Sequence, residues 1–281
     1  PRRLHVVGVG GPGMSEIAIV LAEMGHEVSG SDIRERSVLD RVRAAGVDVN
    51  VGHRRELVHG RDAITWSTAI PNPNIERDEA DKVGVLSLHR AGMLAAICAR
   101  ARSIGVAGTH GKTSTTSMLM LILAEAGLRP NFIIGGDVAD IGTGAQWTGG
   151  EWLVVEADES DGTHLELPLY STILTNVEAD HLDHFGTAEA IVGSFGTYLA
   201  QSPGPKVLCA DDPVCRTLAG ELGHDDGAVT YGIADSTQPP DATPGATPDV
   251  IADQIEAGHG EMRFRVRTRG GVLGHVRVPL R

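Results

Sequence analysis

Strand and helix patterns alternate along the first hundred residues, and this alternation constrains the fold more than any other feature of the chain. An apolar strand, "LHVV", leads through glycines into a helical pattern, "GMSEIAIVLAEMGH", and similar pairs follow as far as residue 101. A second series begins with "RSIGVAG" at residue 102. Because alternating strands and helices are typical of parallel sheets, we predict an α/β chain, with a Rossmann-like domain over 1–101 and a second domain over 102–281.

Apolar residues at helical spacing predict helices over 37–45, 74–83, 112–126 and 187–200. The tail of the chain has a different character. A loop rich in proline and threonine over 237–248 precedes "EMRFRVRTRGGVLGHVRVPL", in which charged and apolar residues alternate on both sides of Gly270-Gly271. This pattern predicts an antiparallel β-hairpin at the end of the second domain.

The formal net charge of −13 argues against electrostatic binding to nucleic acid or to an anionic membrane surface. A bound phosphate must then be held by groups close to it, such as loop amides, a lysine or metal ions. The three cysteines, Cys98, Cys209 and Cys215, form no CxxC pair. No apolar run reaches the roughly 18 residues of a membrane span. We therefore expect reduced thiols in a cytoplasmic protein, and the sequence leaves its oligomeric state open.

The first glycine-rich loop, "GVGGPG", follows the first strand and has the spacing GxGxxG. Its glycines are Gly8, Gly10, Gly11 and Gly13, and Asp32 stands 19 residues beyond the last of them. This is the position of a dinucleotide fingerprint, in which a diphosphate lies at a helix N-terminus and an acid contacts a ribose. The pyrophosphate of a UDP-sugar fits the same geometry, as does a tight turn without a ligand, so the loop alone does not identify what it binds.

The second loop, "GVAGTHGKTSTTS" (105–117), predicts a nucleoside triphosphate site. Lys112 is placed to reach the β- and γ-phosphates, and the Thr113 hydroxyl is placed to bind Mg²⁺. The loop departs from a strict P-loop motif, because Val106 stands where the first glycine is required. The alternative is a helix capped by Thr109 with an incidental lysine.

Acidic residues follow two of the strands predicted for the second domain. "EWLVVEADESD" ends in Glu156, Asp158, Glu159 and Asp161, and "STILTNVEADHLDH" ends in a second set: Glu178, Asp180, His181, Asp183 and His184. Carboxylates at the ends of strands beside a P-loop are placed to bind hard cations. Zinc is disfavoured because no cysteine or third histidine stands at ligand spacing. The alternative is a pair of solvated surface loops.

These motifs resemble the Mur ligase family. The resemblance is carried by "HVVGVGGPGMSEIA", "VSGSD", "WSTAIPNPN", "GTHGKTSTTS", "VVEADESD" and "TNVEADHLDHF", which stand in the family's order between residues 5 and 186. Within the family, "EADESD" followed by "NVEADHLD" favours the members that join L-alanine to UDP-N-acetylmuramate over the murein tripeptide ligases. The resemblance implies an ATP- and Mg²⁺-dependent enzyme of cell-wall peptidoglycan synthesis. In its reaction, the muramyl carboxylate is phosphorylated by ATP and the amine of L-alanine then displaces phosphate.

The resemblance also implies roles for individual residues. It implies that residues 1–101 bind the UDP-sugar and that 102–281 bind ATP. The implied ATP loop is Gly108, Thr109, His110, Gly111, Lys112, Thr113 and Ser114. The implied metal ligands are Thr113, Glu156 and His181, and the implied catalytic residues are Lys112, Glu156 and His181. The implied substrate contacts are Gly8, Gly10, Gly11, Gly13, Met14, Asp32, His53, Ser67, Thr68, Arg90, Ser160 and Asp161. Glu16 departs from the family's usual glycine and adds an anion near the expected diphosphate.

Other interpretations of the sequence stay open. An NAD(P)-dependent oxidoreductase would use the GxGxxG loop but would leave "GTHGKTST" and both acidic strand ends without a role. A non-catalytic nucleotide-binding module and a murein tripeptide ligase are further alternatives. The resemblance implies a third, amino-acid-binding domain that these 281 residues do not supply. We therefore expect that this chain is a partial fragment and that it does not complete ligation by itself.

Overall fold

The computed structural model describes residues 1–138, 141–178, 180, 185–234, 247–258 and 260–279. The chain forms two compact units. Unit one comprises residues 1–106 and 112–169, and unit two comprises the described residues of 107–111 and 170–281. The domain boundary predicted after residue 101 stays a prediction.

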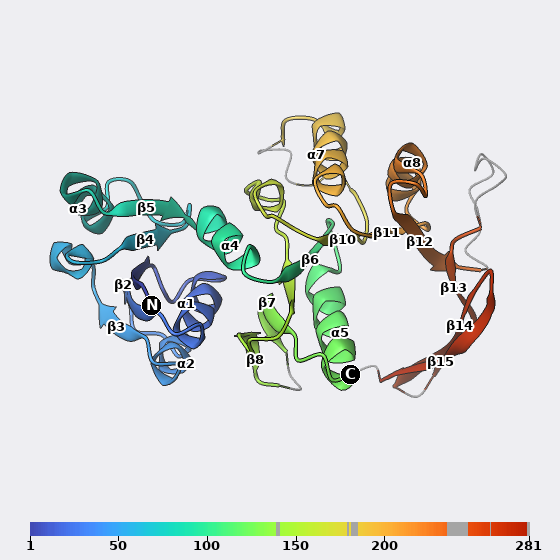
Figure 1. Ribbon diagram of the computed structural model, residues 1–281, viewed down its shortest axis with the longest axis horizontal. Coiled ribbons are helices and arrows are strands. Elements are labelled where there is room, and N and C mark those ends of the chain that lie inside the picture. The colour runs from blue at the N-terminus through green and yellow to red at the C-terminus, as the bar shows by residue number, and fades with distance from the viewer. Residues whose placement is uncertain (139–140, 179, 181–184, 235–246, 259, 280–281) are drawn as a thin grey trace. The chain divides into compact units, whose positions relative to one another are not determined.

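Unit one begins with a five-stranded parallel sheet of order β3-β2-β1-β4-β5 (Figure 1). Its strands are β1 (Arg3–Val7), β2 (Glu27–Asp32), β3 (Asp48–Val51), β4 (Ala63–Trp66) and β5 (Leu86–His89). Its helices are α1 (Met14–Glu23), α2 (Val38–Ala44), α3 (Ile75–Val83), α4 (Arg90–Cys98) and the short 3-10 helix η1 (Arg55–Val58). The α/β alternation predicted from the sequence is therefore confirmed for this part of the chain.

Apolar strands and capped helices build this sheet. Val7 of β1 and Ile64 of β4 are fully buried and pack with Val58 of η1 and Ala80 of α3. Helix α3 begins at a capping residue, Asn74, whose side-chain oxygen accepts hydrogen bonds from the next two helical amides at 3.0 and 3.2 Å. A cap of this type satisfies amides that have no partner inside the helix.

The rest of unit one is a second group of strands, of order β6-β9-β7-β8. Strands β6 (Arg102–Ala107), β9 (Trp152–Glu156) and β7 (Asn131–Val138) are parallel, and β8 (Thr143–Gln146) pairs antiparallel with β7. Helix α5 (Lys112–Glu125) packs on β7 and β9, where Met120 joins a cluster of buried side chains from β7, namely Phe132, Ile134 and Val138. Only the last residue of β6, Ala107, belongs to unit two.

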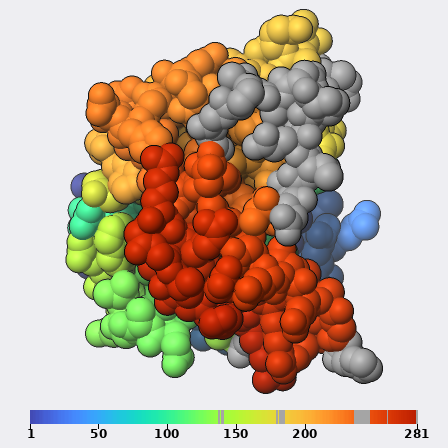
Figure 2. Space-filling view, turned by 90° about the vertical axis from the view of Figure 1, so that its right-hand side faces the viewer, coloured from blue at the N-terminus to red at the C-terminus, as the bar shows by residue number. Residues whose placement is uncertain are grey.

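Unit two contains strands of order β15-β14-β13-β12-β11-β10. The first four along the chain are parallel: β10 (Ser171–Leu174), β11 (Lys206–Cys209), β12 (Ala228–Ile233) and β13 (Val250–Gly258). Strands β14 (Glu261–Thr268) and β15 (Gly271–Pro279), red in Figure 2, complete an antiparallel meander with β13. Its helices are α7 (Ala188–Ala200) and α8 (Pro213–Leu222), and the short 3-10 helix η2 (Thr163–Leu165) belongs to unit one.

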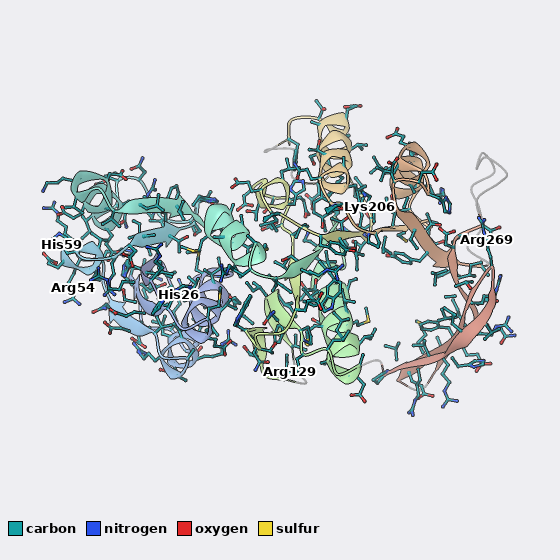
Figure 3. All side chains as sticks on the ribbon, in the orientation of Figure 1. His26, Arg54, His59, Arg129, Lys206 and Arg269 are labelled. Atoms are coloured by element: carbon teal, nitrogen blue, oxygen red, sulfur yellow. The ribbon has the colours of Figure 1, made fainter. Side chains whose placement is uncertain are left out.

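The hairpin predicted at Gly270-Gly271 is confirmed, since Thr268 pairs with Gly271 across its turn. The sequence did not predict β8, β12, β13 or α8, which carry weaker patterns. Most of the loop expected over 237–248 lies outside the described residues. Lys206, labelled in Figure 3, is buried inside unit two, where its ammonium donates to the carbonyls of Gly204 and Asp226 at 3.2 and 2.8 Å. Within the described segments, no helix combines the length and apolar character that a membrane span requires.

Candidate functional site

The residues expected to contact a uridine nucleotide lie along one edge of the first sheet. Because all five strands are parallel, their carboxyl ends meet at the same edge, where ligands of such sheets bind. The first glycine loop follows β1, and Asp32 ends β2. The others come directly after the remaining strands: His53 after β3, Ser67 and Thr68 after β4, and Arg90 after β5.

The glycine loop after β1 is braced by Asp32. The buried Asp32 carboxylate accepts a hydrogen bond from the Gly10 amide at 3.0 Å, and a side chain at Gly10 would meet that carboxylate at 2.9 Å. Gly11 donates its amide to Gly8 at 2.9 Å, and Gly13 precedes α1 with a φ of 73°. These contacts fix the turn that leads into the N-terminus of α1, where a helix can bind an anion.

Two side chains beside this loop have neighbours that the sequence did not predict. Met14 is fully buried, and its amide already donates to the Gly11 carbonyl at 3.1 Å. Glu16 is also buried, and its carboxylate lies 2.9 Å from the Ser15 hydroxyl and 3.5 Å from the Arg41 guanidinium. Arg41 thus offsets part of the negative charge that Glu16 adds to the first turn of α1.

His53 belongs to a buried polar cluster centred on Glu76 of α3. The Oε2 atom of Glu76 accepts a hydrogen bond from Ser31 at 2.6 Å and lies 3.0 Å from Nδ1 of His53 and 3.5 Å from Nε2 of His5. The Arg54 amide donates to its Oε1 at 3.0 Å. Burial alone would raise the pKa of Glu76, but its hydrogen bonds lower it to about 2. The hydrogen bond between His53 and Glu76 also raises the pKa of His53.

The phosphate-loop residues 107–111 are held, within unit two, by the end of β10. The Asn176 side chain accepts a hydrogen bond from the His110 amide at 2.8 Å and donates to the His110 carbonyl at 2.9 Å. The Thr109 amide donates to the Asn176 carbonyl at 3.1 Å, and the Thr175 hydroxyl donates to the His110 carbonyl at 2.7 Å. Asn176 thus accepts hydrogen bonds from the amides of both Thr109 and His110.

Thr113 and Glu156, the two predicted metal ligands that the structure describes, are in contact. The Thr113 hydroxyl lies 3.2 and 3.1 Å from the two oxygens of Glu156, and the Gly135 amide donates to Oε2 at 2.9 Å. A hydroxyl and a carboxylate are hard oxygen donors of the kind that Mg²⁺ prefers. His181, the third predicted ligand, lies outside the described residues. Within the described ranges, no group of three or more His, Cys, Asp or Glu side chains is arranged to hold a metal ion.

The segment that follows Glu156 neutralises two cations of unit one. Lys112 forms an ion pair with Glu159 at 2.7 Å. Arg90 donates from Nη2 to Asp158 at 2.9 Å and from Nε to Asp161 at 3.0 Å. Although burial raises the pKa of Asp158, hydrogen bonds from Ser160 and the charges of Arg90 and Lys112 hold it below its usual value. Ser160 itself donates its amide to Asp158 at 3.0 Å.

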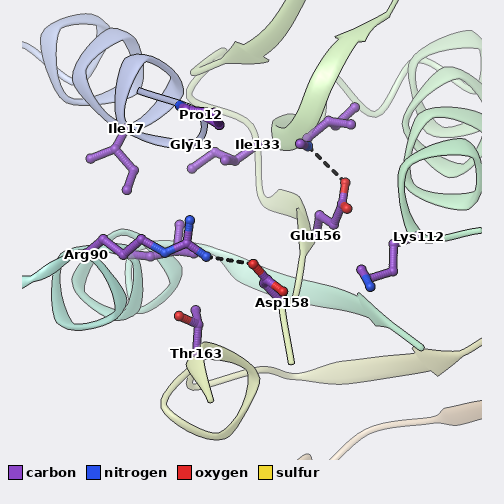
Figure 4. A pocket seen from close by; sticks show the side chains of 12 residues that line it. Pro12, Gly13, Ile17, Arg90, Lys112, Ile133, Glu156, Asp158 and Thr163 are labelled. Carbon is purple, nitrogen blue, oxygen red and sulfur yellow. Dashed lines mark hydrogen bonds and ion pairs between the residues drawn. The ribbon is translucent and has the colours of Figure 1, made fainter. Parts of the chain in front are cut away.

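A cavity of about 290 Å³ brings these groups together within unit one (Figure 4). Figure 4 shows Arg90 and Lys112 on opposite sides of Asp158, with Gly13 and Ile17 of the first sheet's loop and helix across the cavity. The full lining is Pro12, Gly13, Ile17, Arg90, Leu94, Lys112, Ile133, Ile134, Gly135, Glu156, Asp158 and Thr163. Arg90, expected at the uridine nucleotide, therefore lines the same cavity as the predicted catalytic residues Lys112 and Glu156.

The sequence assigned no role to Glu76 or Asn176, and it grouped Glu159 with the acids expected to bind hard cations rather than with a lysine. Glu76 supports His53, Asn176 holds the phosphate loop, and Glu159 binds Lys112. Glu159 carried a signal, since it belongs to the acidic run after β9. Glu76 and Asn176 carried no local signal, because each acts on a residue far away in the sequence. The predicted loop residue Ser114 lies exposed in the first turn of α5.

Comparisons with known proteins give matches along most of the chain. The Mur ligase family catalytic domain matches residues 3–102, and the Mur ligase middle domain matches residues 106–280. The UDP-N-acetylmuramate–L-alanine ligase of Bradyrhizobium sp. (strain ORS 278) is 45% identical over 232 residues, which are 82% of this chain and 50% of that protein. The enzyme of that name from Pelotomaculum thermopropionicum is 40% identical over 275 residues, covering 97% of this chain and 57% of that protein.

Two solved structures share the fold. UDP-N-acetylmuramate:L-alanyl-gamma-D-glutamyl-meso-diaminopimelate ligase from Neisseria meningitides has a TM-score of 0.80 at 25% identity, covering 98% of this chain and 86% of that one. UDP-N-acetylmuramate-alanine ligase MurC from Thermotoga maritima has a TM-score of 0.80 at 24% identity, with coverages of 99% and 60%. The chain spans about half the length of the curated relatives it matches. The domain matches cover both halves of the sequence and show that this chain belongs to the Mur ligase family.

Proposed function

We propose that this chain provides the UDP-sugar and ATP sites of a cytoplasmic ligase that joins L-alanine to UDP-N-acetylmuramate in peptidoglycan synthesis. The observation that carries the proposal is the cavity in which Gly13 and Arg90 face Lys112 and Glu156. Such a cavity brings a diphosphate-type loop and a triphosphate-type lysine to one place. The relatives named UDP-N-acetylmuramate–L-alanine ligase support the choice of substrates.

The edge of the first sheet is proposed to bind the uridine nucleotide. The amides at the start of α1 favour a diphosphate, and Asp32 keeps their loop in the required turn. His53, whose pKa is raised by Glu76, supplies a polar ring close to the same edge. This arrangement leaves the sugar end of the substrate directed at the cavity, where Arg90 offers a cation to its carboxylate.

Lys112, Thr113 and Glu156 are proposed to hold the phosphates of ATP and their Mg²⁺. The contact between the Thr113 hydroxyl and the Glu156 carboxylate fits a hard cation by its donor atoms. When bound, Mg²⁺ supplies positive charge that stabilises phosphoryl transfer from ATP to the muramyl carboxylate. His181 remains a proposed third ligand.

The residues of the chain then have to bring two anions together. A carboxylate and a triphosphate repel each other, and positive groups fixed in advance lower that barrier. Lys112 and Arg90 line one cavity and supply two such groups once the reactants replace their present carboxylate partners. Holding both reactants in one cavity also removes much of the entropic cost of their encounter. The amine of L-alanine would finally displace phosphate from the activated carbonyl.

Calorimetric titration of the 281-residue chain in magnesium buffer tests the proposal. UDP-N-acetylmuramate, UDP and NADH are titrated separately, and we expect heat from the two uridine compounds and none from NADH. Binding of NADH without a response to the UDP-sugar would identify the first loop as a dinucleotide site and remove the ligase assignment. The full-length parent protein, supplied with L-alanine or with a murein tripeptide, distinguishes the two sister activities by which substrate it joins.

A further inference from the structure

The ion pair between Lys112 and Glu159 is a largely buried contact of the candidate phosphate site. Nζ of Lys112 lies 2.7 Å from Oε1 of Glu159, and the two side chains are 15% and 3% exposed. Lys112 lines the cavity, and Figure 4 shows its side chain next to Glu156 and Asp158. The lysine expected to bind phosphate is therefore already paired with an anion of its own chain.

The hydrogen-bonding capacity of the Glu159 carboxylate is only partly used among the described residues. Its second oxygen, Oε2, is buried and has no hydrogen-bond partner among the residues that the structure describes. Burial raises the pKa of the Glu159 carboxyl despite the neighbouring Lys112. A buried carboxylate with one bonded oxygen is costly, because the other oxygen has lost its water without a replacement.

The neighbouring acids of the same segment, Asp158 and Asp161, differ from Glu159 in their hydrogen-bond partners. Asp158 accepts hydrogen bonds from Arg90 and from the Ser160 amide, and Asp161 accepts them from Arg90 and from the Thr163 amide. Each of these carboxylates therefore bonds a cation and also stabilises a backbone turn. Among the described residues, the Glu159 carboxylate bonds the Lys112 ammonium, and its own backbone amide is the other hydrogen-bonding group that works against the rise in its pKa caused by burial.

We propose that Glu159 is the resident counter-anion of Lys112, which a nucleotide phosphate must displace, so that Glu159 sets the affinity of this site for nucleotides. The inference rests on the proposed function in one respect, because it takes Lys112 as a phosphate ligand. A phosphate that approaches the ammonium meets the Glu159 carboxylate at close range, and the two like charges repel each other in a region with little water. Removing the charge of Glu159 while keeping its shape should therefore strengthen nucleotide binding.

The test compares wild type with Glu159→Gln and with Glu166→Gln as a matched control. Glu166 lies seven residues later and is exposed, so its substitution changes the net charge equally without touching Lys112. Affinity for the non-hydrolysable ATP analogue AMP-PNP is measured by calorimetry with Mg²⁺, on the 281-residue chain. We expect Glu159→Gln to bind about tenfold more tightly and Glu166→Gln to bind as wild type. Equal or weaker binding by Glu159→Gln, with wild type binding normally, overturns the inference and leaves the proposed function standing. Absence of binding by every variant overturns both.

Lysine NMR provides a second readout that needs no nucleotide. The chain has three lysines, Lys82, Lys112 and Lys206, so the Lys112 side-chain signal can be assigned with a Lys112→Arg variant. Glu159→Gln should shift the Lys112 signal without ligand, and AMP-PNP should shift the same signal in wild type. The signal of Lys82, whose side chain is 74% exposed, should not move in either case. An unchanged Lys112 signal in folded Glu159→Gln would show that the pair does not exist in solution and would overturn the inference.

Discussion

The Thr113 hydroxyl contacts both carboxylate oxygens of Glu156, at 3.2 and 3.1 Å, although the two residues lie 43 positions apart in the chain. The contact joins the first turn of α5 to the end of β9, and the Gly135 amide of β7 completes it. Three elements of unit one thus place a hydroxyl and a carboxylate beside each other. That arrangement is what a magnesium-dependent nucleotide site requires.

Glu156→Gln should weaken magnesium-dependent binding of AMP-PNP by at least about tenfold. The loss of one supporting group at a metal site typically lowers the affinity by this amount. The amide keeps the side chain's shape but removes the charge that would bind the cation. Thr113→Ser retains a hydroxyl and should bind almost as wild type, whereas Thr113→Val should resemble Glu156→Gln. Calorimetry with Mg²⁺ and with EDTA measures the difference. Equal losses in both buffers would show that Glu156 does not act through a metal.

Gly108→Ala should destabilise the chain by about 1–3 kcal/mol, as expected for an overpacked site. An added Cβ would lie 2.2 Å from the Thr175 hydroxyl oxygen and 2.9 Å from the Asn176 carbonyl oxygen, and Gly108 has a φ of 129°. Urea unfolding checks this expectation. The control is Gly220→Ala in α8, where nothing lies within 4 Å of the added atom, so the change should be neutral or stabilising. Equal effects of the two substitutions would contradict the steric argument.

Asn176→Ala should loosen the phosphate loop, because it removes both side-chain hydrogen bonds to the His110 backbone. Hydrogen exchange at the His110 amide should accelerate about tenfold, which corresponds to the roughly 1.4 kcal/mol of a good hydrogen bond. Asn176→Asp keeps the oxygen that accepts from this amide and should retain most of the protection. Unchanged exchange in Asn176→Ala would mean that the Thr175 hydroxyl and the backbone contacts hold the loop without the Asn176 side chain.

Glu76→Gln should destabilise the chain on the order of 3 kcal/mol at neutral pH, because it removes the buried charge that His53 and Ser31 contact. Glu79→Gln on the same helix is the control. Its partner His59 has a side chain that is 53% exposed, so the loss should stay below about 1 kcal/mol. Urea unfolding at pH 7 compares the two, and similar losses would contradict a special role for the buried cluster.

Glu76 also predicts how stability depends on pH. Its pKa is lowered to about 2 in the folded chain, so its contribution is present above the ordinary value of 4.5 and is lost as the pH falls from about 5 toward 2. The contribution of His53 to stability changes with pH in the opposite direction, because its pKa is raised in the folded chain. This contribution is present below pH 6.5 and is lost as the pH rises through the pKa that His53 has in the folded chain. Unfolding midpoints between pH 3 and 8 should fall at both ends in wild type, and Glu76→Gln should flatten both changes. A parallel acid slope in the two proteins would exclude Glu76 as its source.

Local sequence determined the fold class and the positions of both loops. Apolar strands, helical spacing and glycines act over a few neighbouring residues, so the first sheet, α5 and the final hairpin were all predictable. Elements with weaker patterns, such as α8 and β13, were missed because their stability depends on the strands they pack against. The site residues that could be predicted are those where a motif carries the chemistry, such as Lys112 and Glu156.

Only the tertiary structure decided which charged and polar groups meet. Arg90 bonds Asp161 across 71 positions, Lys112 bonds Glu159 across 47, and Asn176 bonds His110 across 66. No local pattern encodes such pairs, because each joins residues that follow different strands, and Arg90 and Asp161 even follow strands of two different sheets. The sequence by itself thus predicted a phosphate loop and determined that an acidic segment follows β9. The fold decided that this segment neutralises the cations of the cavity, since ion pairs depend on distance in space and on exclusion of water.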